Sequence, residues 1–245
     1  MDDFEYLSDY YDQFVGADYQ KIANYIDKKI KCAAIGGNYG VDLGCGSGTL
    51  TYLLSDTGYD MIGVDRSEGM LMRALEKKPA ESKVLFLQQD LTQLDLYGAA
   101  DFMVSTLDCL NYLEDEQLVK EFMSSCSRFL KPGGLLILDF NSLYKYRQVL
   151  DGQNFIYESD DAFCIWENEF DGRNMYYDLT YFVQKDTLYE RREEHQMQTY
   201  YSLDFIIIVV SSNGFEILSL EDDYDELPIS DETQRIVLTA QKRSK

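Results

Sequence analysis

The sequence predicts an α/β protein with a doubly wound, mostly parallel sheet of seven strands and a small antiparallel β insertion. Over the first ~140 residues, short apolar runs alternate with amphipathic ones, which is the pattern of successive βα units. After about residue 150 the pattern changes to period-two stretches rich in tyrosine and acidic residues, which are typical of antiparallel hairpins. The two final apolar runs resemble a hairpin, so we expect the last strand to run antiparallel.

The first five strands are predicted where the apolar runs are almost continuous. Runs of this kind suit a parallel sheet that is covered on both faces. They lie at residues 39–43, 60–64, 83–88, 101–105 and 134–139.

Helices are predicted between these strands. Residues 20–31 carry isoleucine at every fourth position, which places the isoleucines on one face of a helix. Helices are also expected at 67–75 and 115–129, because each segment begins with a Ser or Asp that can cap a helix N-terminus. The Lys-Pro-Gly-Gly segment at 131–134 is expected to end the last of these helices and to turn into the next strand.

The second half of the chain is predicted to hold the insertion and the last elements of the main sheet. We expect the main body to comprise residues 1–142 and 201–245, and the insertion to comprise 143–200. The insertion strands are predicted at 163–170, 175–183 and 188–200, with turns at 171–174 and 185–186, and a helix at 201–212 precedes strands at 214–220 and 235–241.

The charge of the chain limits its partners. Asp and Glu number 44 against 22 Lys and Arg, which gives a formal net charge of −22. Nucleic acids and anionic membrane surfaces attract basic proteins, so neither is an expected partner. A cationic or neutral partner is easier to accommodate. The alternative is that the charge only keeps the protein soluble.

Cysteine usage and hydropathy indicate a cytoplasmic protein without structural metal. The five cysteines are scattered and form no C-x-x-C pair, which argues against a disulfide framework or a zinc site. The first residues carry neither the basic start nor the apolar stretch of a signal peptide. The most apolar run, 205–210, is too short to span a bilayer.

Three glycines at alternate positions mark the first candidate site. The segment VDLGCGSGT (41–49) follows a predicted strand and opens a predicted helix. Glycine permits positive φ angles and a close approach of backbone to a ligand, while a helix start offers N–H groups and a partial positive charge. Gly44, Gly46 and Gly48 therefore indicate a nucleotide-like ligand at the carboxyl end of the first strand. A purely structural turn is the alternative.

Acidic residues end the next two predicted strands. Asp65 lies 19 residues after Gly46, where a carboxylate is placed to bind both ribose hydroxyls of an adenosine. Asp90 ends the third strand, where it can accept from an adenine amine. The alternative role of Asp65 is a helix cap, which Ser67 also offers. The glycine spacing is G-x-G-x-G and not the G-x-G-x-x-G of nicotinamide dehydrogenases.

Four segments together resemble class I S-adenosylmethionine-dependent methyltransferases. They are VDLGCGSGT (41–49), GVDRSEGML (63–71), QQD (88–90) and LKPGGLLILD (130–139). The Tyr-Asp-x-Phe start at 11–14 is similar to that of small bacterial members with a β-rich cap, among them sugar-amine N-methyltransferases. The resemblance implies a Rossmann-like fold, S-adenosylmethionine as cofactor, no metal, and residues 143–200 as a cap over the acceptor.

The resemblance also implies which residues bind the cofactor. Those expected beside its methionine and ribose parts are Asp42, Gly44, Cys45, Gly46, Asp65, Thr106 and Leu107, with Asp42 suited to the cationic amine. Those expected at the adenine are Arg66, Asp90 and Leu91, and Tyr11 is expected to close over the cofactor.

Candidates for a role at the acceptor come from two places in the chain. Asp108 and Asn111 follow the fourth strand, where this fold opens its active site, and Asp108 is placed to orient an amine or take its proton. Its alternative role is a local turn or helix cap. His195 is the sole histidine. In the resembled family, a histidine near this point of the cap can face the acceptor. The alternative is an exposed strand histidine beside Glu193 and Glu194.

The expected reaction is in-line methyl transfer to nitrogen or oxygen of a small molecule, for which the protein mainly supplies positioning. The tyrosines and Trp166 of the insertion, among many acids, favour a cationic amine, unless this tyrosine-rich sheet simply packs on the body. The alternatives are a protein or RNA methyltransferase and a non-catalytic cofactor-binding assembly or regulatory protein. We expect a monomer or homodimer.

Overall fold

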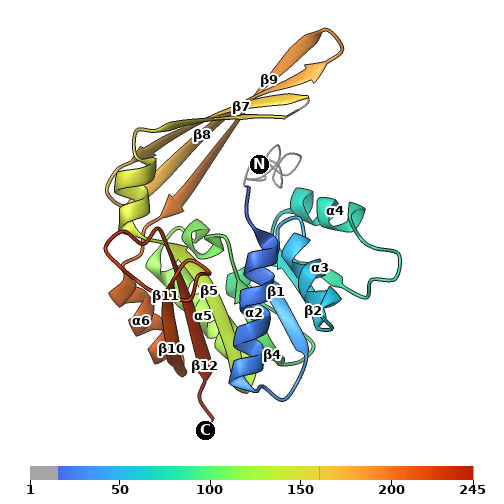
Figure 1. Cartoon of the computed structure of the whole chain (residues 1–245), viewed down its shortest axis with the longest axis vertical. Helices are drawn as coiled ribbons and strands as arrows, with labels where there is room; N and C mark the ends of the chain where they lie inside the picture. Colours follow the sequence, from blue (N-terminus) through green and yellow to red (C-terminus); the bar gives the residue numbers. More distant parts are fainter. Residues whose placement is uncertain (1–15, 160, 245) are drawn as a thin grey trace.

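The protein consists of a main sheet flanked by helices and of a second, smaller sheet (Figure 1). The computed structural model describes residues 16–159 and 161–244. The Tyr-Asp-x-Phe segment, and with it the cofactor role expected for Tyr11, lies outside the described residues. Within the described part, the predicted strands and helices are present with bounds that agree within two residues, apart from the start of one strand.

The main sheet has a parallel core, and two strands near one edge, β12 and the short β11, run antiparallel to it. Neighbouring strands from β5 to β3 pair in parallel, and β12 runs antiparallel to both β5 and β10. These pairings confirm the predicted doubly wound sheet with an antiparallel last strand. In spatial order the strands are β11 (Leu227–Pro228), β10 (Phe215–Asp222), β12 (Arg235–Lys242), β5 (Leu130–Asn141), β4 (Ala100–Ser105), β1 (Tyr39–Leu43), β2 (Asp60–Asp65) and β3 (Leu85–Gln88).

Two details of this sheet differ from the prediction. The sheet has eight strands and not seven, because the two-residue β11 adds to its edge; two residues carry no alternation that a sequence pattern could reveal. The segment 131–134 is part of β5 and not a turn before it. The register between β4 and β5 shifts at this segment, between Ala100 and Phe102, so the Pro-Gly-Gly residues form an irregularity inside the strand.

Helices cover both faces of the main sheet (Figure 1). Ile26 of α2 and Leu54 of α3 belong to one buried cluster, whereas Phe122 of α5 and Val209 of α6 belong to a second. No helix within the described residues has the length and apolar character needed to cross a membrane. The helices are α2 (Tyr19–Ala33), α3 (Thr49–Asp56), α4 (Glu68–Glu76), α5 (Glu116–Phe129) and α6 (Leu203–Ser212).

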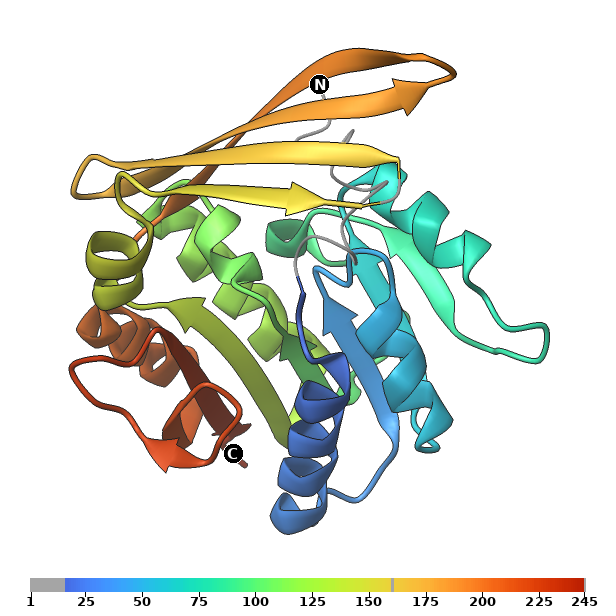
Figure 2. The same cartoon turned by 45° about the horizontal axis from the view of Figure 1, so that its top comes forward.

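The second sheet lies across the end of the main sheet at which the parallel strands finish (Figure 2). Its four strands are antiparallel and follow the order β6 (Asn154–Glu158), β7 (Ala162–Phe170), β8 (Asn174–Lys185) and β9 (Leu188–Thr199). The hairpin turns fall where the sequence predicted them. The sequence analysis missed β6, which has no fully buried residue, and the six-residue π-helical turn η3 (Lys145–Leu150) that joins β5 to this sheet.

Candidate active site

A cavity of about 360 Å³ lies between the carboxyl ends of β1–β4 and the second sheet. This volume falls within the usual range of ligand pockets. Ten of the residues expected to bind the cofactor line it together, although they come from four separate strand ends. They are Asp42, Gly44, Cys45, Gly46, Asp65, Arg66, Asp90, Leu91, Thr106 and Leu107.

The glycine loop needs glycine for both its backbone shape and its packing. Gly44 has a φ of 74°, and a Cβ added there would lie 2.1 Å from Sγ of Cys109. Gly46 has a φ of 50°, and its amide donates to Oδ2 of Asp65 at 2.8 Å. Residues with a side chain rarely adopt such left-handed angles. The glycines also let the loop backbone pack closely against its neighbours, and this backbone forms part of the cavity wall.

Asp65 holds the glycine loop at the cavity wall. Its Oδ1 accepts from the Ser67 amide at 2.9 Å and its Oδ2 from the Gly46 amide. The carboxylate also lines the cavity beside the glycine loop. The residue that caps α4 is Ser67, whose hydroxyl accepts from the Met70 amide. Ser67 therefore has the capping role that was the alternative for Asp65.

Asp90 also combines a structural bond with a position on the cavity. Its Oδ1 accepts from the amide and the hydroxyl of Thr92, at 2.8 and 2.7 Å, and thereby starts the short 3₁₀ helix η1 (Leu91–Gln93). Because both bonds go to one oxygen, Oδ2 retains its lone pairs for an N–H donor in the cavity.

Asp42 is a buried carboxyl beneath the loop. It is 1% exposed and accepts from the Thr51 hydroxyl at 2.6 Å. Burial raises the pKa of Asp42 to about 7, and the nearby Asp65 acts in the same direction. The carboxyl is therefore poised to gain or lose a proton near neutral pH.

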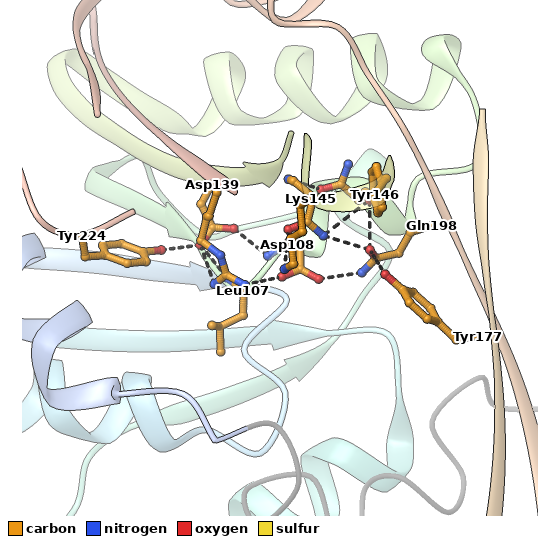
Figure 3. A network of polar contacts seen from close by, with 11 residues as sticks. Leu107, Asp108, Asp139, Lys145, Tyr146, Tyr177, Gln198 and Tyr224 are labelled. Carbon is orange, nitrogen blue, oxygen red and sulfur yellow. Dashed lines mark hydrogen bonds and ion pairs between the residues drawn. The ribbon is translucent and has the colours of Figure 1, made fainter. Parts of the chain in front are cut away.

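On the other side of the cavity, Asp139 fixes the loop that follows β4 (Figure 3). This buried carboxylate accepts from the amides of Leu107 and Asp108, at 2.8 and 2.6 Å, and from the hydroxyl of Tyr224. Leu107 and Asp108 both have a φ of 56°, which is uncommon for residues other than glycine. Asp139 therefore stabilises a strained loop whose side chains line the cavity.

Asp108 is fully engaged by neighbouring side chains. Its Oδ1 accepts from Nη2 of Arg235 at 2.7 Å, and its Oδ2 accepts from Nε2 of Gln198 at 2.6 Å. Burial alone would raise the pKa of Asp108, but the positive charges of Lys145 and Arg235 outweigh burial and the pKa is lowered. Asp108 precedes the 3₁₀ helix η2 (Cys109–Tyr112) without a side-chain capping bond. It is thus an ionised group and a weak proton acceptor.

Gln198 joins the second sheet to the main sheet at this point (Figure 3). While its amide donates to Asp108, its Oε1 accepts from the hydroxyls of Tyr146 and Tyr177, at 3.0 and 2.9 Å, and from Nδ2 of Asn141 at 3.0 Å. No role was expected for Gln198 from the sequence. The sequence carries one signal for this role, which is a polar residue at every second position of β9. These residues, Glu194, Gln196 and Gln198, are all buried in the structure.

The same alternation places His195 outside the cavity. Successive strand residues point to opposite faces, and His195 lies between two buried residues. Its side chain is 75% exposed, with Nδ1 2.5 Å from Oδ1 of Asp178. The structure therefore corresponds to the exposed strand histidine that the sequence analysis left as the alternative, and not to a histidine facing the acceptor.

Asn111 lies behind the cavity wall and not on it. It is fully buried; its Nδ2 donates to the Thr199 carbonyl and its Oδ1 accepts from the Asn141 amide, both at 2.9 Å. Both polar ends of the side chain are therefore bound to backbone. Its position indicates that it supports the site by fixing η2 against β5 and the end of β9.

Aromatic side chains of the second sheet form the far wall of the cavity. Phe155, Tyr157, Trp166 and Tyr177 all line it, and the ring of Trp166 lies 5.8 Å from that of Tyr157 and 5.6 Å from that of Tyr177. Tyr189, by contrast, is exposed. The part of the cavity beyond Asp108 thus offers aromatic faces next to charged groups.

The part of the cavity around the glycine loop suits a cationic adenosyl compound. Three carboxyl groups, those of Asp42, Asp65 and Asp90, line it. Their negative charge attracts a cation and repels a pyrophosphate. No group of three or more His, Cys, Asp or Glu residues within 16–159 and 161–244 is arranged to hold a metal ion. The donor set therefore fits S-adenosylmethionine.

Comparisons with known proteins agree with this geometry. A family model described as a methyltransferase domain matches residues 41–134. The putative methyltransferase YqeM of Bacillus subtilis (strain 168) is 30% identical over 205 residues, which cover 82% of this chain and 83% of that protein. The chain belongs to the S-adenosylmethionine-dependent methyltransferases. A putative methyltransferase of Geobacillus sp. (strain WCH70) is 30% identical over 245 residues, covering 98% of this chain and 99% of that protein.

Solved structures show the same methyltransferase fold. An S-adenosylmethionine-dependent methyltransferase from Clostridium acetobutylicum ATCC 824 superposes with a TM-score of 0.89 at 29% identity, over 97% of this chain and 98% of that one. The amino pentose methyltransferase CalS10 from Micromonospora echinaspora, solved with S-adenosylmethionine bound, gives a TM-score of 0.74 at 17% identity, over 93% and 92%. The sugar N-methyltransferase KedS8 from Streptoalloteichus sp. ATCC 53650 gives a TM-score of 0.78 at 18% identity, over 96% of this chain and 91% of that one.

Proposed function

We propose that this methyltransferase transfers a methyl group to a nitrogen of a small-molecule amine. The observation that carries the proposal is the continuity of one cavity, which runs from the acidic glycine loop past Asp108 to the aromatic wall of the second sheet. Residues 143–200 serve as the cap over the acceptor, and residues 1–142 and 201–245 as the cofactor-binding body. CalS10 is described as an amino pentose methyltransferase and KedS8 as a sugar N-methyltransferase, and both have the fold of this chain, which supports an amine acceptor.

In this proposal the strand ends hold the cofactor. Asp65 accepts from the ribose hydroxyls, and Asp42 and the glycine loop lie beside the methionine part. When bound, S-adenosylmethionine supplies a methyl group on a positively charged sulfur. The adenine lies among Arg66, Asp90 and Leu91, and the methionine part also meets Cys45, Thr106 and Leu107.

The acceptor lies between the loop after β4 and the aromatic wall. Asp108 is ionised in its network, and a negative charge beside aromatic faces favours a cationic group. The protein's main contribution is to hold the acceptor nitrogen on the axis of the methyl group, because positioning of this kind supplies several kcal/mol of the barrier. The Leu107–Asp108 backbone, whose amides both donate to Asp139, suits this role.

Calorimetry tests the cofactor site. We expect S-adenosylmethionine to bind and NAD not to bind. Asp65→Asn should weaken binding of S-adenosylmethionine about tenfold or more, because hydrogen bonds to a charged group contribute about 1.5–3 kcal/mol. Asp60→Asn is the matched control, since Asp60 lies at the other end of the same strand and is exposed. Binding of NAD in place of S-adenosylmethionine would overturn the proposal.

A panel of acceptors tests the substrate class. Benzylamine, glucosamine, phenol and benzoate are incubated with the protein and S-adenosylmethionine, and formation of S-adenosylhomocysteine is measured. Trp166, the single tryptophan, reports acceptor binding by its fluorescence because it lines the cavity. We expect the amines to be preferred. Preference for benzoate contradicts an amine acceptor, and tight cofactor binding with no turnover of any acceptor favours a cofactor-binding regulatory protein.

A further inference from the structure

Lys145 is an amine on the wall of the acceptor part of the cavity that the proposed chemistry has not used. It begins the helical turn η3, which leads from β5 into the cap, and it lines the cavity. Its Nζ donates to Oδ1 of Asn141 at 2.8 Å. Within the described residues no carboxylate lies close enough to Nζ to form an ion pair with it.

The charges that face Lys145 come from four other segments. They are Asp108 after β4, Asp139 on β5, Arg235 on β12 and Asp223 after β10. Burial lowers the pKa of Lys145, and Arg235 acts in the same direction, whereas the three carboxylates oppose them; the pKa remains below its usual value. A partly buried lysine of this kind can carry a lone pair at a pH where surface lysines cannot.

Other groups near the acceptor are poor bases for geometric or electrostatic reasons. Asp108 already accepts from Arg235 and Gln198, and its pKa is lowered. His195 lies on the outer face of the cap, away from the cavity. Burial raises the pKa of Cys109 to about 12, and Glu114 is exposed at the edge of the cavity. Compared with these groups, Lys145 is therefore better placed to act as a base toward an acceptor inside the cavity.

We propose that Lys145 is the base that removes a proton from the acceptor's ammonium group before methyl transfer. This inference rests on the proposed function. An ammonium nitrogen has no lone pair, so a proton must first pass from it to the lone pair of Nζ. The freed lone pair then bonds to the methyl carbon while the methyl–sulfur bond breaks and its electron pair stays on sulfur. The products are a methylated ammonium and S-adenosylhomocysteine, and Lys145 returns its proton to water.

The surroundings of Lys145 favour such a transfer. The negative charge of Asp108 stabilises the acceptor's ammonium before the transfer and the lysine ammonium after it. The charge of Lys145 once it has taken the proton, and Arg235, which bonds to Asp108 at 2.7 Å, lower the pKa of Asp108, so that this carboxylate does not itself keep the proton. The arrangement separates the two tasks: Asp108 supplies charge and Lys145 supplies the lone pair.

Direct titration tests the inference without any acceptor. The side-chain nitrogens of isotopically labelled lysines are followed by NMR from pH 6 to 11, in the protein saturated with S-adenosylhomocysteine. The Lys145 signal is identified by its loss in Lys145→Met, and Lys120→Met identifies a surface lysine as the control. We expect the Lys145 signal to titrate at a lower pH than the signal of the surface lysine, because burial lowers the pKa of Lys145. Titration of both at the same pH would overturn the inference.

Kinetics with the amine that the panel identifies provide the second test. Lys145→Met should lower kcat about 100-fold or more, as expected for the loss of a general base, and should remove the rise of kcat with pH. Lys145→Arg keeps the positive charge but cannot accept the proton, so it should be equally impaired; full activity of Lys145→Arg would show a purely electrostatic role and overturn the inference. Lys120→Met should leave kcat unchanged.

The two proposals fail in distinguishable ways. Absence of S-adenosylmethionine binding in calorimetry removes the proposed function itself. Normal binding of S-adenosylmethionine by wild type, Lys145→Met and Lys145→Arg, combined with an ordinary titration of Lys145, removes only the role as base.

Discussion

Asp42 is a single carboxyl whose burial links the stability of the protein to pH. Its pKa is about 7 in the folded protein, against a usual value of 3.8. Between these two values the folded protein holds a proton on this group that the unfolded chain has lost. The contribution of Asp42 to stability is therefore most favourable below about pH 4, falls as the pH rises to about 7, and is constant above that.

Asp42→Asn should remove this dependence. Asparagine keeps an oxygen that can accept from Thr51 but carries no charge to bury. The stability of the variant relative to wild type should therefore increase by up to about 1.4 kcal/mol per pH unit between about pH 4 and pH 7. Urea unfolding at pH 5 and at pH 8 measures the difference. An identical difference at both pH values would show that Asp42 does not titrate in this range.

Gly44 illustrates the packing of single residues at the site. Gly44→Ala should lose about 1–2 kcal/mol for its left-handed backbone and about 1–3 kcal/mol more for the contact with Cys109, because the added Cβ would lie 2.1 Å from Sγ. Gly133→Ala is the control, since Gly133 has a φ of 77° and open space around its Cβ position. Urea unfolding compares the two; equal losses would mean that Cys109 moves aside freely.

At the scale of elements, the connection between β10 and β12 supports the loop that carries Asp108. Tyr224 in this connection donates its hydroxyl to Asp139, which binds the amides of that loop. The same connection is tied to α2 by ion pairs, with Lys21 at 2.8 Å from both Asp223 and Asp225. Three elements distant in sequence thus meet behind one wall of the cavity.

Tyr224→Phe should weaken this support. The variant leaves a buried carboxylate without one of its donors, so the free energy of unfolding should fall by about 1.5–3 kcal/mol. Tyr189→Phe is the matched control, because Tyr189 is 63% exposed. Thermal or urea unfolding of both variants measures the effect. A loss in Tyr224→Phe no larger than in the control would show that water or a rearranged side chain replaces the hydroxyl.

At the scale of the whole molecule, the net charge of −22 should make stability depend on salt. Like charges repel one another across the folded surface, and salt screens this repulsion by shortening the Debye length from about 30 Å at 10 mM to about 8 Å at 150 mM. The midpoint of thermal unfolding at pH 8 should therefore rise over this range of sodium chloride. The rise should shrink at about pH 4.5, close to the sequence isoelectric point of about 4.3, because many carboxylates are protonated there. A falling midpoint would mean that surface ion pairs outweigh the repulsion.

The meeting of the glycine loop and the strand-end acids at one cavity could be predicted because its signals are local. The glycines at 44 and 46 and the acids at 65 and 90 each end a strand, and the carboxyl ends of parallel strands meet at one edge of a sheet. Their positions in the chain therefore determine that they meet, and all line one cavity. A role for His195 was harder to judge, since a shift of one residue along a strand moves a side chain to the opposite face.

By itself, the sequence determined the doubly wound sheet, the antiparallel insertion and the meeting of a glycine loop with acidic strand ends, because hydrophobic period, turn residues and strand ends are properties of neighbouring residues. Only the tertiary structure decided what surrounds Asp108. Asp108 meets Gln198 and Arg235 across 90 and 127 positions of the chain, and Lys145 reaches the same cavity from a turn with no sequence signature. Contacts between residues so distant depend on how the cap and the last strand pack against the sheet, and no local pattern encodes that packing.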